Sequence, residues 1–248
     1  KSTDYELKKT KAREYYAQNQ YVKASELLSQ VIPRFRATSE AEELNWLNAQ
    51  SYFGMKQYEI AGTLYKALGE QYPYGQYAEE ATFLAALCDY NLAPRAQLDQ
   101  QSSRNSIEGF NVFITKFPYS PKVEEARKYI DELLERLVEK SYLNARLYYD
   151  MKEYKAAITA LSNSLKEYSS SKYREEMMFL KLNSLFLYAE NSFSLRQTER
   201  YQATLDDYFS FMEEYPQSRY SKEVAKIYQE TTKFLKIKNI ENLANNQQ

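Results

Sequence analysis

Residues 58–81, YEIAGTLYKALGEQYPYGQYAEEA, contain one copy of a spacing that recurs along the chain. Tyr58 is followed fourteen positions later by Tyr72 and then Pro73, and Ala81 lies nine positions after Tyr72. The same frame fits Tyr21/Phe35/Leu44, Ser103/Phe117/Ala126, Tyr154/Tyr168/Met177 and Tyr201/Tyr215/Val224. Proline follows the second aromatic residue in three copies, and Arg36 and Ser169 replace it in the others. The chain therefore contains five copies of one unit.

The apolar residues of this unit lie on one face of a helix. They recur every three or four residues, at Tyr58, Ala61, Leu64/Tyr65, Leu68 and Tyr72. The Tyr-Pro pair ends this helix, because proline cannot join the preceding hydrogen-bond ladder and disfavours helical geometry in the residue before it. Paired acids such as Glu79 and Glu80 mark the next helix, since negative charge is favourable at a helix N-terminus. Each unit is predicted to be a helix hairpin.

The unit resembles the tetratricopeptide repeat, which is about 34 residues long. Small and aromatic residues expected before the second helix occur at Ala12/Tyr15, Ala49/Tyr52 and Ala145/Tyr148. The units begin at residues 21, 58, 103, 154 and 201, so later ones contain extra helix or loop. Low Gly and Pro content and the lack of strand-like alternation also favour helix. We predict an all-α tetratricopeptide-repeat α-solenoid of about five helix hairpins with a capping helix.

The breaks in this pattern suggest a division of the chain. Two polar stretches, Gln97 to Arg104 and Asn191 to Glu199, are expected to be inserted loops, and Lys122 to Met151 contains no helix breaker. At 1.5 Å per residue this helix is about 45 Å long and would join two groups of repeats rigidly. We therefore expect repeats 1–3 at 5–121, the long connecting helix and repeats 4–5 at 122–238, and a frayed polar tail at 239–248.

Composition excludes several classes of function. Without histidine, His-based acid–base catalysis and His-containing metal sites are impossible, and no glycine-rich phosphate loop is present. We expect no enzyme activity, no catalytic residue, no cofactor and no metal. The lone cysteine, Cys88, is expected to be a buried small hydrophobe. The net charge of −1 gives no nucleic-acid footprint, although lysines between Arg219 and Lys238 form either a solvated helix face or a contact for an acidic partner or anionic lipid.

Aromatic residues indicate binding to a peptide. The chain has 25 Tyr and 12 Phe, and repeat geometry places groove-facing positions on the first helix of each hairpin. These positions are Arg13, Tyr16, Trp46, Gln50, Phe53, Phe83, Leu87 and Tyr90. An aromatic wall with few charges suits an extended or hairpin peptide rich in aromatic residues, because planar side chains give contact area at little entropy cost. Packing is the alternative role for each of them.

Longer motifs resemble the BamD family, the tetratricopeptide-repeat lipoproteins of the bacterial outer-membrane β-barrel assembly machinery. The motifs are Tyr72-Pro-Tyr-Gly-Gln-Tyr77, the segment from Asp99 to Phe110, Phe117-Pro-Tyr-Ser120, and the run from Leu137 to Tyr149 that leads to Tyr154-Lys-Ala-Ala-Ile158. The resemblance covers about residues 5 to 235. Two departures are Ser141, where the family usually has an acid, and the absence of an N-terminal lipid-bearing cysteine. The chain begins at Lys1 with no signal-like segment, so we expect it to start beyond a removed segment and the anchor.

The resemblance implies a scaffold at the periplasmic face of the outer membrane, held by an N-terminal lipid anchor absent from this chain. Repeats 1–3 would receive the targeting segment of unfolded outer-membrane barrel proteins. Repeats 4–5 would dock the periplasmic domains of the barrel-forming assembly subunit, and there we expect Arg146, Tyr149 and Asp150 to take part.

Other functions remain open on the sequence. A periplasmic tetratricopeptide adaptor of the cell-division coordinator type also carries Tyr-Pro-x-Ser-x-Tyr motifs, although such proteins usually have a coiled coil and three repeats. A cytosolic peptide-binding co-chaperone, or an enzyme without histidine, belongs to another class. A signal peptide ending in a lipobox in the upstream gene sequence would favour the lipoprotein.

Overall fold

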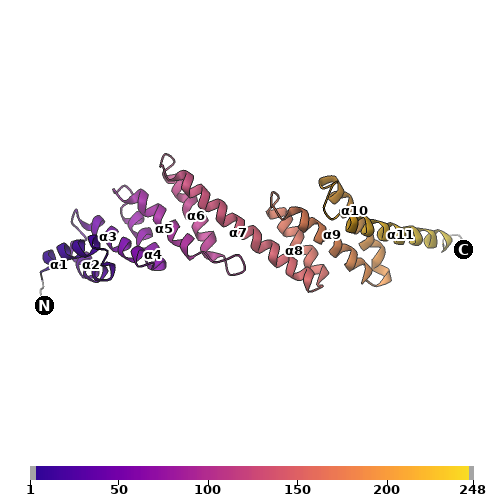
Figure 1. The fold of residues 1–248 in the computed structure, drawn as a ribbon, viewed down its shortest axis with the longest axis horizontal. Helices are drawn as coiled ribbons and strands as arrows, with labels where there is room; N and C mark the ends of the chain where they lie inside the picture. The colour runs from indigo at the N-terminus through magenta and orange to yellow at the C-terminus, as the bar shows by residue number, and fades with distance from the viewer. Residues whose placement is uncertain (1–3, 246–248) are drawn as a thin grey trace. The chain divides into compact units, whose positions relative to one another are not determined.

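A computed structural model describes residues 4–245 of the chain, with side chains described to residue 238. In this range the protein has eleven α-helices and no strand, as predicted (Figure 1). The chain divides into two compact units, unit 1 ending at Leu137 and unit 2 beginning at Val138. This division falls within helix α7 (Val123–Asp150), which is continuous as expected. The division predicted at residues 121 and 122 lies just before the same helix.

The helices of each unit form hairpins that follow one another in chain order. Unit 1 contains α1 (Tyr5–Ala17), α2 (Tyr21–Phe35), α3 (Ala41–Gly54), α4 (Tyr58–Gln71), α5 (Ala78–Leu92), α6 (Gln101–Lys116) and the first half of α7. Unit 2 contains the second half of α7, α8 (Tyr154–Glu167), α9 (Arg174–Glu190), α10 (Ser194–Glu214) and α11 (Ser221–Asn245). Together they form the five predicted hairpins and the capping helix.

The repeated sequence signals produce repeated backbone features. Helices α4, α6 and α10 end one residue before the aromatic residue of the Tyr-Pro or Phe-Pro pair, as proline requires. The first turns of α3, α5, α7 and α9 each hold two glutamates, as expected at positive helix N-termini. Three hairpin turns use one left-handed residue, Asn19, Lys56 or Lys152, two positions before the second helix begins.

Both predicted insertions are shorter than expected, because polar residues within them form helix starts. Helix α6 begins at Gln101, where the Asp99 carboxylate accepts from the Gln101 backbone N–H. The side chain of Gln100 is fully buried and donates to the carbonyls of Arg95 and Leu98. The polar residues here bond to backbone groups at the start of α6 and in the loop before it, and do not form a longer solvated loop. Helix α10 likewise begins at Ser194, inside the second predicted insertion.

The end of the chain also continues a helix. Helix α11 reaches Asn245, well into the range 239–248 that was predicted to be a frayed tail. Residues 246–248 of that range, like residues 1–3, lie outside the described part of the chain.

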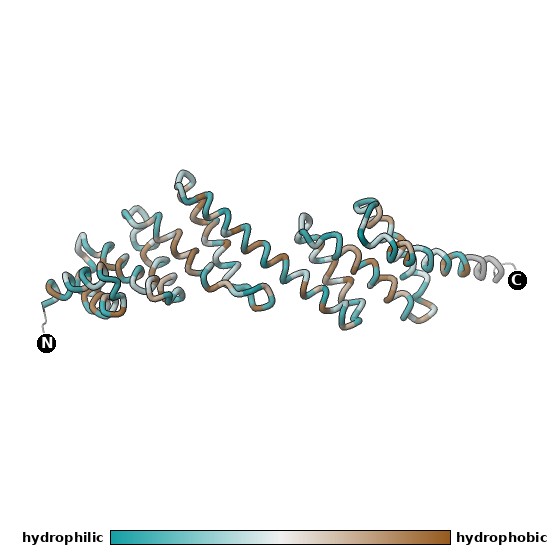
Figure 2. Tube along the Cα trace, in the orientation of Figure 1, coloured by the Kyte–Doolittle hydropathy of each residue, from teal (hydrophilic) through white to brown (hydrophobic). Residues whose placement is uncertain are grey.

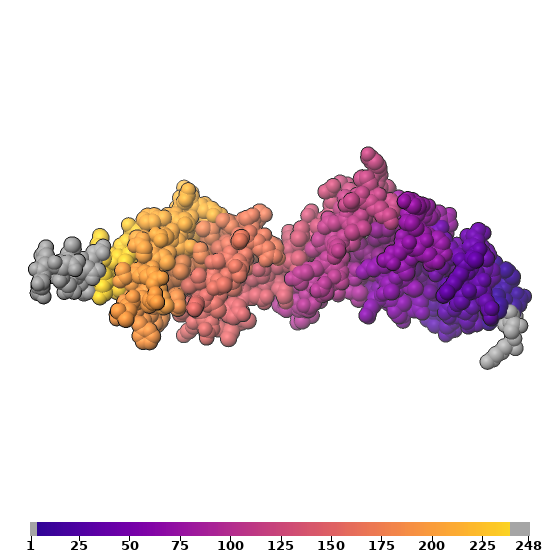
Figure 3. All heavy atoms as spheres, turned by 180° about the vertical axis from the view of Figure 1, so that it is seen from behind, coloured from indigo at the N-terminus to yellow at the C-terminus, as the bar shows by residue number. Residues whose placement is uncertain are grey.

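Apolar side chains are buried between neighbouring helices within each unit. In Figure 2 hydrophobic positions alternate along the helices with hydrophilic ones, and the turns are mostly hydrophilic. The largest core cluster of unit 1 is centred on Tyr65, Phe83, Phe110 and Phe113, all nearly or fully buried. Unit 2 has one cluster around Leu161 and Met177 and another around Leu182 and Phe211. In space-filling view the residues of each unit follow one another in colour order (Figure 3), as expected when each repeat contacts only its neighbours.

One contact recurs at every junction between repeats, and we call it the junction contact. The residue five positions after the second aromatic of a repeat touches the first helix of that repeat. In unit 1 the junction contacts are Lys9–Glu40 (2.6 Å), Trp46–Tyr77 (stacked rings, 4.7 Å) and Lys122 over the Phe83 ring (4.8 Å). In unit 2 they are the ring stacks Tyr142–Tyr173 (4.4 Å) and Phe179–Tyr220 (4.1 Å). The same position thus uses an ion pair, a cation–π contact or stacked rings.

Candidate functional site

The first helices of the repeats in unit 1 bring most of the predicted groove residues together. Trp46, Gln50 and Phe53 lie on one face of α3, since they are spaced by four and three residues. We call the surface formed by Arg13, Tyr16, Trp46, Gln50, Phe53, Leu87 and Tyr90 the inner face of unit 1. All seven side chains are partly exposed and so can touch a ligand.

Stacked rings hold the centre of the inner face. The Trp46 indole lies almost parallel to the Tyr77 ring, with an interplanar angle of 8°. Beneath them the fully buried Tyr65 ring contacts both Trp46 (5.7 Å) and Phe53 (6.3 Å). Burial raises the pKa of the Tyr65 hydroxyl, which has no hydrogen-bond partner among the described residues. The partly exposed rings of Trp46 and Phe53 are therefore packed against a buried aromatic ring.

The one charged side chain among the seven, Arg13, is paired with glutamates. The Arg13 guanidinium donates to the carboxylates of Glu43 (2.6 Å) and Glu40 (3.0 Å). Hydrogen bonds from Lys9 and Arg13 hold the pKa of Glu40 below its ordinary value. At the other end the Tyr90 hydroxyl donates to Glu132, which raises the pKa of Tyr90. Arg13 is therefore neutralised by glutamates, whereas the carboxylate beside Tyr90 has a neutral partner.

Phe83 differs from the other predicted groove residues. Its side chain is 3% exposed and packs against Phe110 (5.5 Å) and Phe113 (5.2 Å) of the next helix. It therefore supports the surface from below. Sequence reasoning missed Tyr77 and Tyr129, which complete the aromatic surface beside Trp46 and Tyr90. The signal for Tyr77 was its place five residues after Tyr72.

The three residues predicted to dock a partner are all in the part of α7 that belongs to unit 2. Arg146 is exposed, ion-pairs with Glu176 (3.2 Å) and lies 3.7 Å from Asp150. Tyr149 is partly buried and its hydroxyl accepts from Asn183 Nδ2 (2.7 Å). The Ser141 hydroxyl lies 2.5 Å from Ser164 Oγ, so this position makes a neutral contact.

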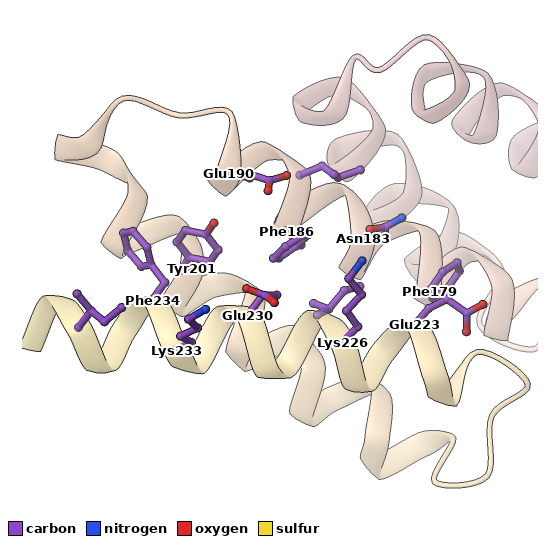
Figure 4. A pocket seen from close by; sticks show the side chains of 13 residues that line it. Phe179, Asn183, Phe186, Glu190, Tyr201, Glu223, Lys226, Glu230, Lys233 and Phe234 are labelled. Atoms are coloured by element: carbon purple, nitrogen blue, oxygen red, sulfur yellow. The ribbon is translucent and has the colours of Figure 1, made fainter.

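Asn183 also lines a pocket in unit 2 that the sequence did not predict. The pocket has a volume of about 600 Å³, and Figure 4 shows α9 on one side and α11 on the other. Its apolar floor includes Phe179, Phe186, Tyr201 and Phe234, the last two being stacked at 4.3 Å. We call it the α9–α11 pocket.

Charges of both signs line the α9–α11 pocket. They are Glu190, Glu223, Lys226, Glu230 and Lys233 (Figure 4). None of these five forms an ion pair with another residue whose side chain the structure describes. The lysines between Arg219 and Lys238 were a partial signal for this site. The packing of α11 beside α9 could not be predicted from their spacing. The pocket can therefore bind a surface that carries complementary charges around an apolar centre.

Two further observations limit the chemistry. Among residues 4–238, no group of three or more cysteine, aspartate or glutamate side chains is placed to hold a metal ion. None of the helices in the described part of the chain combines the length and apolar character needed to cross a membrane.

Comparisons with known proteins identify a family. The sequence model of the family described as YfiO: Outer membrane lipoprotein matches residues 5–187. No curated protein matches the chain significantly. Among solved structures, the chain is similar to the TPR2AB-domain:pHSP90-complex of yeast Sti1, with a TM-score of 0.40 and 13% identity over 92% of this chain and 98% of that one. The fold assignment rests on the order and packing of the helices themselves.

Proposed function

The chain belongs to the YfiO family of outer membrane lipoproteins, and we propose that it is a non-enzymatic scaffold of the outer-membrane β-barrel assembly complex. It would be held at the periplasmic face of the outer membrane by a lipid anchor outside this chain. One unit would bind the targeting segment of unfolded barrel proteins, and the other the periplasmic domains of the barrel-forming subunit. Capture and handover need no covalent chemistry, which agrees with the absence of histidine.

The single observation that carries this proposal is the aromatic inner face of unit 1, whose one charged side chain, Arg13, is already paired with glutamates. A segment of an unfolded barrel protein is extended and rich in aromatic residues. Such a segment gains contact area on Trp46 and Phe53 without having to break the ion pairs of Arg13. Rigid support by Tyr65 lowers the entropy cost of binding, since the rings are already fixed.

The α9–α11 pocket supports the second part of the proposal. A folded domain presents fixed charges at fixed distances. Such a surface can satisfy the five charges of the pocket, which have no ion pair among the side chains that the structure describes. Arg146, Tyr149 and Asp150 would extend this docking surface along α7, because Tyr149 is joined to the pocket residue Asn183.

Site-specific photocrosslinking tests the assignment of the two surfaces. A photoreactive residue at Gln50 should crosslink to a synthetic peptide copying the C-terminal strand of an outer-membrane barrel protein from the same organism. The same residue at Lys226 should crosslink to the purified periplasmic domains of the barrel-forming subunit. Ala67, exposed on α4 away from both surfaces, serves as the control position. Crosslinks to neither probe would disprove the scaffold function and favour the cell-division adaptor.

A further inference from the structure

A third surface lies on the outer side of the first hairpin. A groove of about 580 Å³ runs between α1 and α2, and three lysines, Lys8, Lys11 and Lys23, line it together with a single carboxylate, Glu26. Arg34 lies on the same side of α2, with its guanidinium 5.2 Å from the Tyr5 ring centre. We call this surface the basic face of the first hairpin. It is strongly cationic on a chain whose net charge is −1.

The cations of the basic face have no carboxylate partners among the described residues. Lys8 Nζ donates to the amide oxygen of Gln30 (2.7 Å), and Lys23 Nζ donates to that of Gln20 (2.8 Å). Each ammonium also lies near a tyrosine ring, Lys8 5.5 Å from Tyr5 and Lys23 5.3 Å from Tyr15. Neutral amides and rings position these charges without neutralising them. The positive potential of the face is therefore available to an anion.

Exposed apolar side chains accompany the charges. Leu7 on α1 is 44% exposed and Val22 on α2 is 58% exposed. The half-buried rings of Tyr5 and Tyr15 pack against the neighbouring core cluster. Cationic side chains around exposed aliphatic groups and tyrosines form the pattern of a surface that lies at the level of lipid headgroups.

The basic face is separate from the inner face of unit 1. On α1, Lys8, Lys11 and Tyr15 lie on one side of the helix, and Lys9 and Arg13 lie roughly opposite because of the 3.6-residue period. Lys9 and Arg13 are bound to glutamates, whereas Lys8 and Lys11 are not. An anion bound to the basic face would leave the inner face free for a peptide.

We propose that the basic face of the first hairpin binds the surface of a lipid bilayer that contains anionic headgroups. Membership in a family of outer membrane lipoproteins places this chain beside a bilayer. A bilayer surface matches dispersed cations on flexible side chains, because headgroups can move to meet them. The contact orients the first hairpin against the membrane in addition to any covalent anchor. It does not depend on binding barrel segments or an assembly partner.

Vesicle cosedimentation of the 248-residue chain tests this proposal. The probes are phosphatidylcholine vesicles and phosphatidylcholine vesicles with about one-third phosphatidylglycerol. The chain should bind only the anionic vesicles and should be released as salt shortens the Debye length from about 10 Å to about 3 Å. The variant Lys8→Gln/Lys11→Gln/Lys23→Gln should lower the partition coefficient about 100-fold, at about fivefold for each charge removed.

The control variant is Lys155→Gln/Lys166→Gln/Lys222→Gln, which makes the same change in net charge at exposed lysines of unit 2. It should bind anionic vesicles within about twofold of the unmodified chain. Circular dichroism checks that both variants are folded, and all six substituted side chains are partly or fully exposed. The proposal is overturned if the unmodified chain ignores anionic vesicles, binds neutral ones equally, or loses binding equally in both variants.

Discussion

Units 1 and 2 use the same repeat positions to build surfaces that differ in whether their charged side chains form ion pairs. On the inner face of unit 1 the one charged side chain, Arg13, pairs with Glu40 and Glu43, and aromatic rings remain for a ligand. In unit 2 the rings form the floor of the α9–α11 pocket, and Lys226 and Lys233 are among five charges without ion pairs to any side chain up to residue 238. The fold therefore fixes where a surface is, and side-chain pairing decides what it can bind.

The junction contacts show the same difference. Unit 1 uses charge in two of its three junction contacts, Lys9–Glu40 and Lys122 over Phe83. Unit 2 uses only neutral ring stacks, such as Phe179 on Tyr220. Stability of the repeats of unit 1 should consequently depend more on pH and salt than that of the repeats of unit 2.

The largest expected effect is the loss of stability when a buried ring is removed from beneath the inner face of unit 1. Phe83→Ala should lower the free energy of unfolding by about 3–5 kcal/mol, because it removes a buried ring from between Phe110 and Phe113. Phe179→Ala, at a half-buried ring of unit 2, should cost about 2 kcal/mol. Urea denaturation measures both. A loss below about 1 kcal/mol for Phe83→Ala would mean that its ring does not support unit 1.

Salt should distinguish the two surfaces in binding assays. Raising ionic strength from about 0.1 M to about 1 M should weaken docking at the α9–α11 pocket about tenfold, since unpaired charges must meet charges on the partner. Binding of an aromatic peptide to the inner face of unit 1 should change less than about twofold. Fluorescence anisotropy at several salt concentrations gives both slopes. Equal dependence of the two affinities on salt concentration would contradict the electrostatic difference between the surfaces.

The smallest effects concern two carboxyl groups whose pKa values move in opposite directions. Lys9 and Arg13 lower the pKa of Glu40, so its contribution to stability is present above the ordinary carboxyl pKa and is lost as pH falls through the lowered value. Burial raises the pKa of Asp207 although Lys181 opposes this, so its protonation adds stability as pH falls through the raised value. Glu40→Gln should therefore reduce the loss of stability of unit 1 at low pH. Asp207→Asn should remove the gain in stability that unit 2 obtains when Asp207 is protonated.

Hydrogen exchange resolved to single peptides measures these changes in each unit separately. The control for Glu40→Gln is Glu59→Gln, at an exposed residue of α4 without an ion pair among the described residues. The role given to Glu40 is contradicted if Glu40→Gln and Glu59→Gln reduce the loss of stability of unit 1 at low pH by the same amount.

Local signals in the sequence predicted most of the fold. Proline after Tyr72, Phe117 and Tyr215, with glutamate pairs beyond, specified where helices end and begin. The first insertion was misjudged because Asp99 and Gln100 look solvated in a sequence. In the fold Asp99 accepts from a backbone N–H at the start of α6, and buried Gln100 donates to carbonyls of the preceding loop. Such roles depend on which backbone group lies nearby, and composition does not contain that information.

The candidate surfaces were less predictable than the fold. Repeat offsets selected Trp46, Phe53 and Tyr90 as groove residues. These residues lie on first helices with partly exposed rings, and their role in binding stays a prediction. The offsets could not show that Phe83 is covered, because this depends on the rings of the following helix. The α9–α11 pocket joins helices more than thirty residues apart, and only the crossing of those helices brings Lys226 near Asn183.

The most direct test of the central claim is to measure both ligands against both surfaces in the full chain. The variants are Trp46→Ala in unit 1 and Lys226→Glu/Lys233→Glu in unit 2. The ligands are the barrel-strand peptide and the periplasmic domains of the barrel-forming subunit. Each variant should lose about tenfold or more in affinity for its own ligand and keep the other within about twofold. Loss of both ligands in one variant, or loss of the opposite ligand, would contradict two separate surfaces of different character.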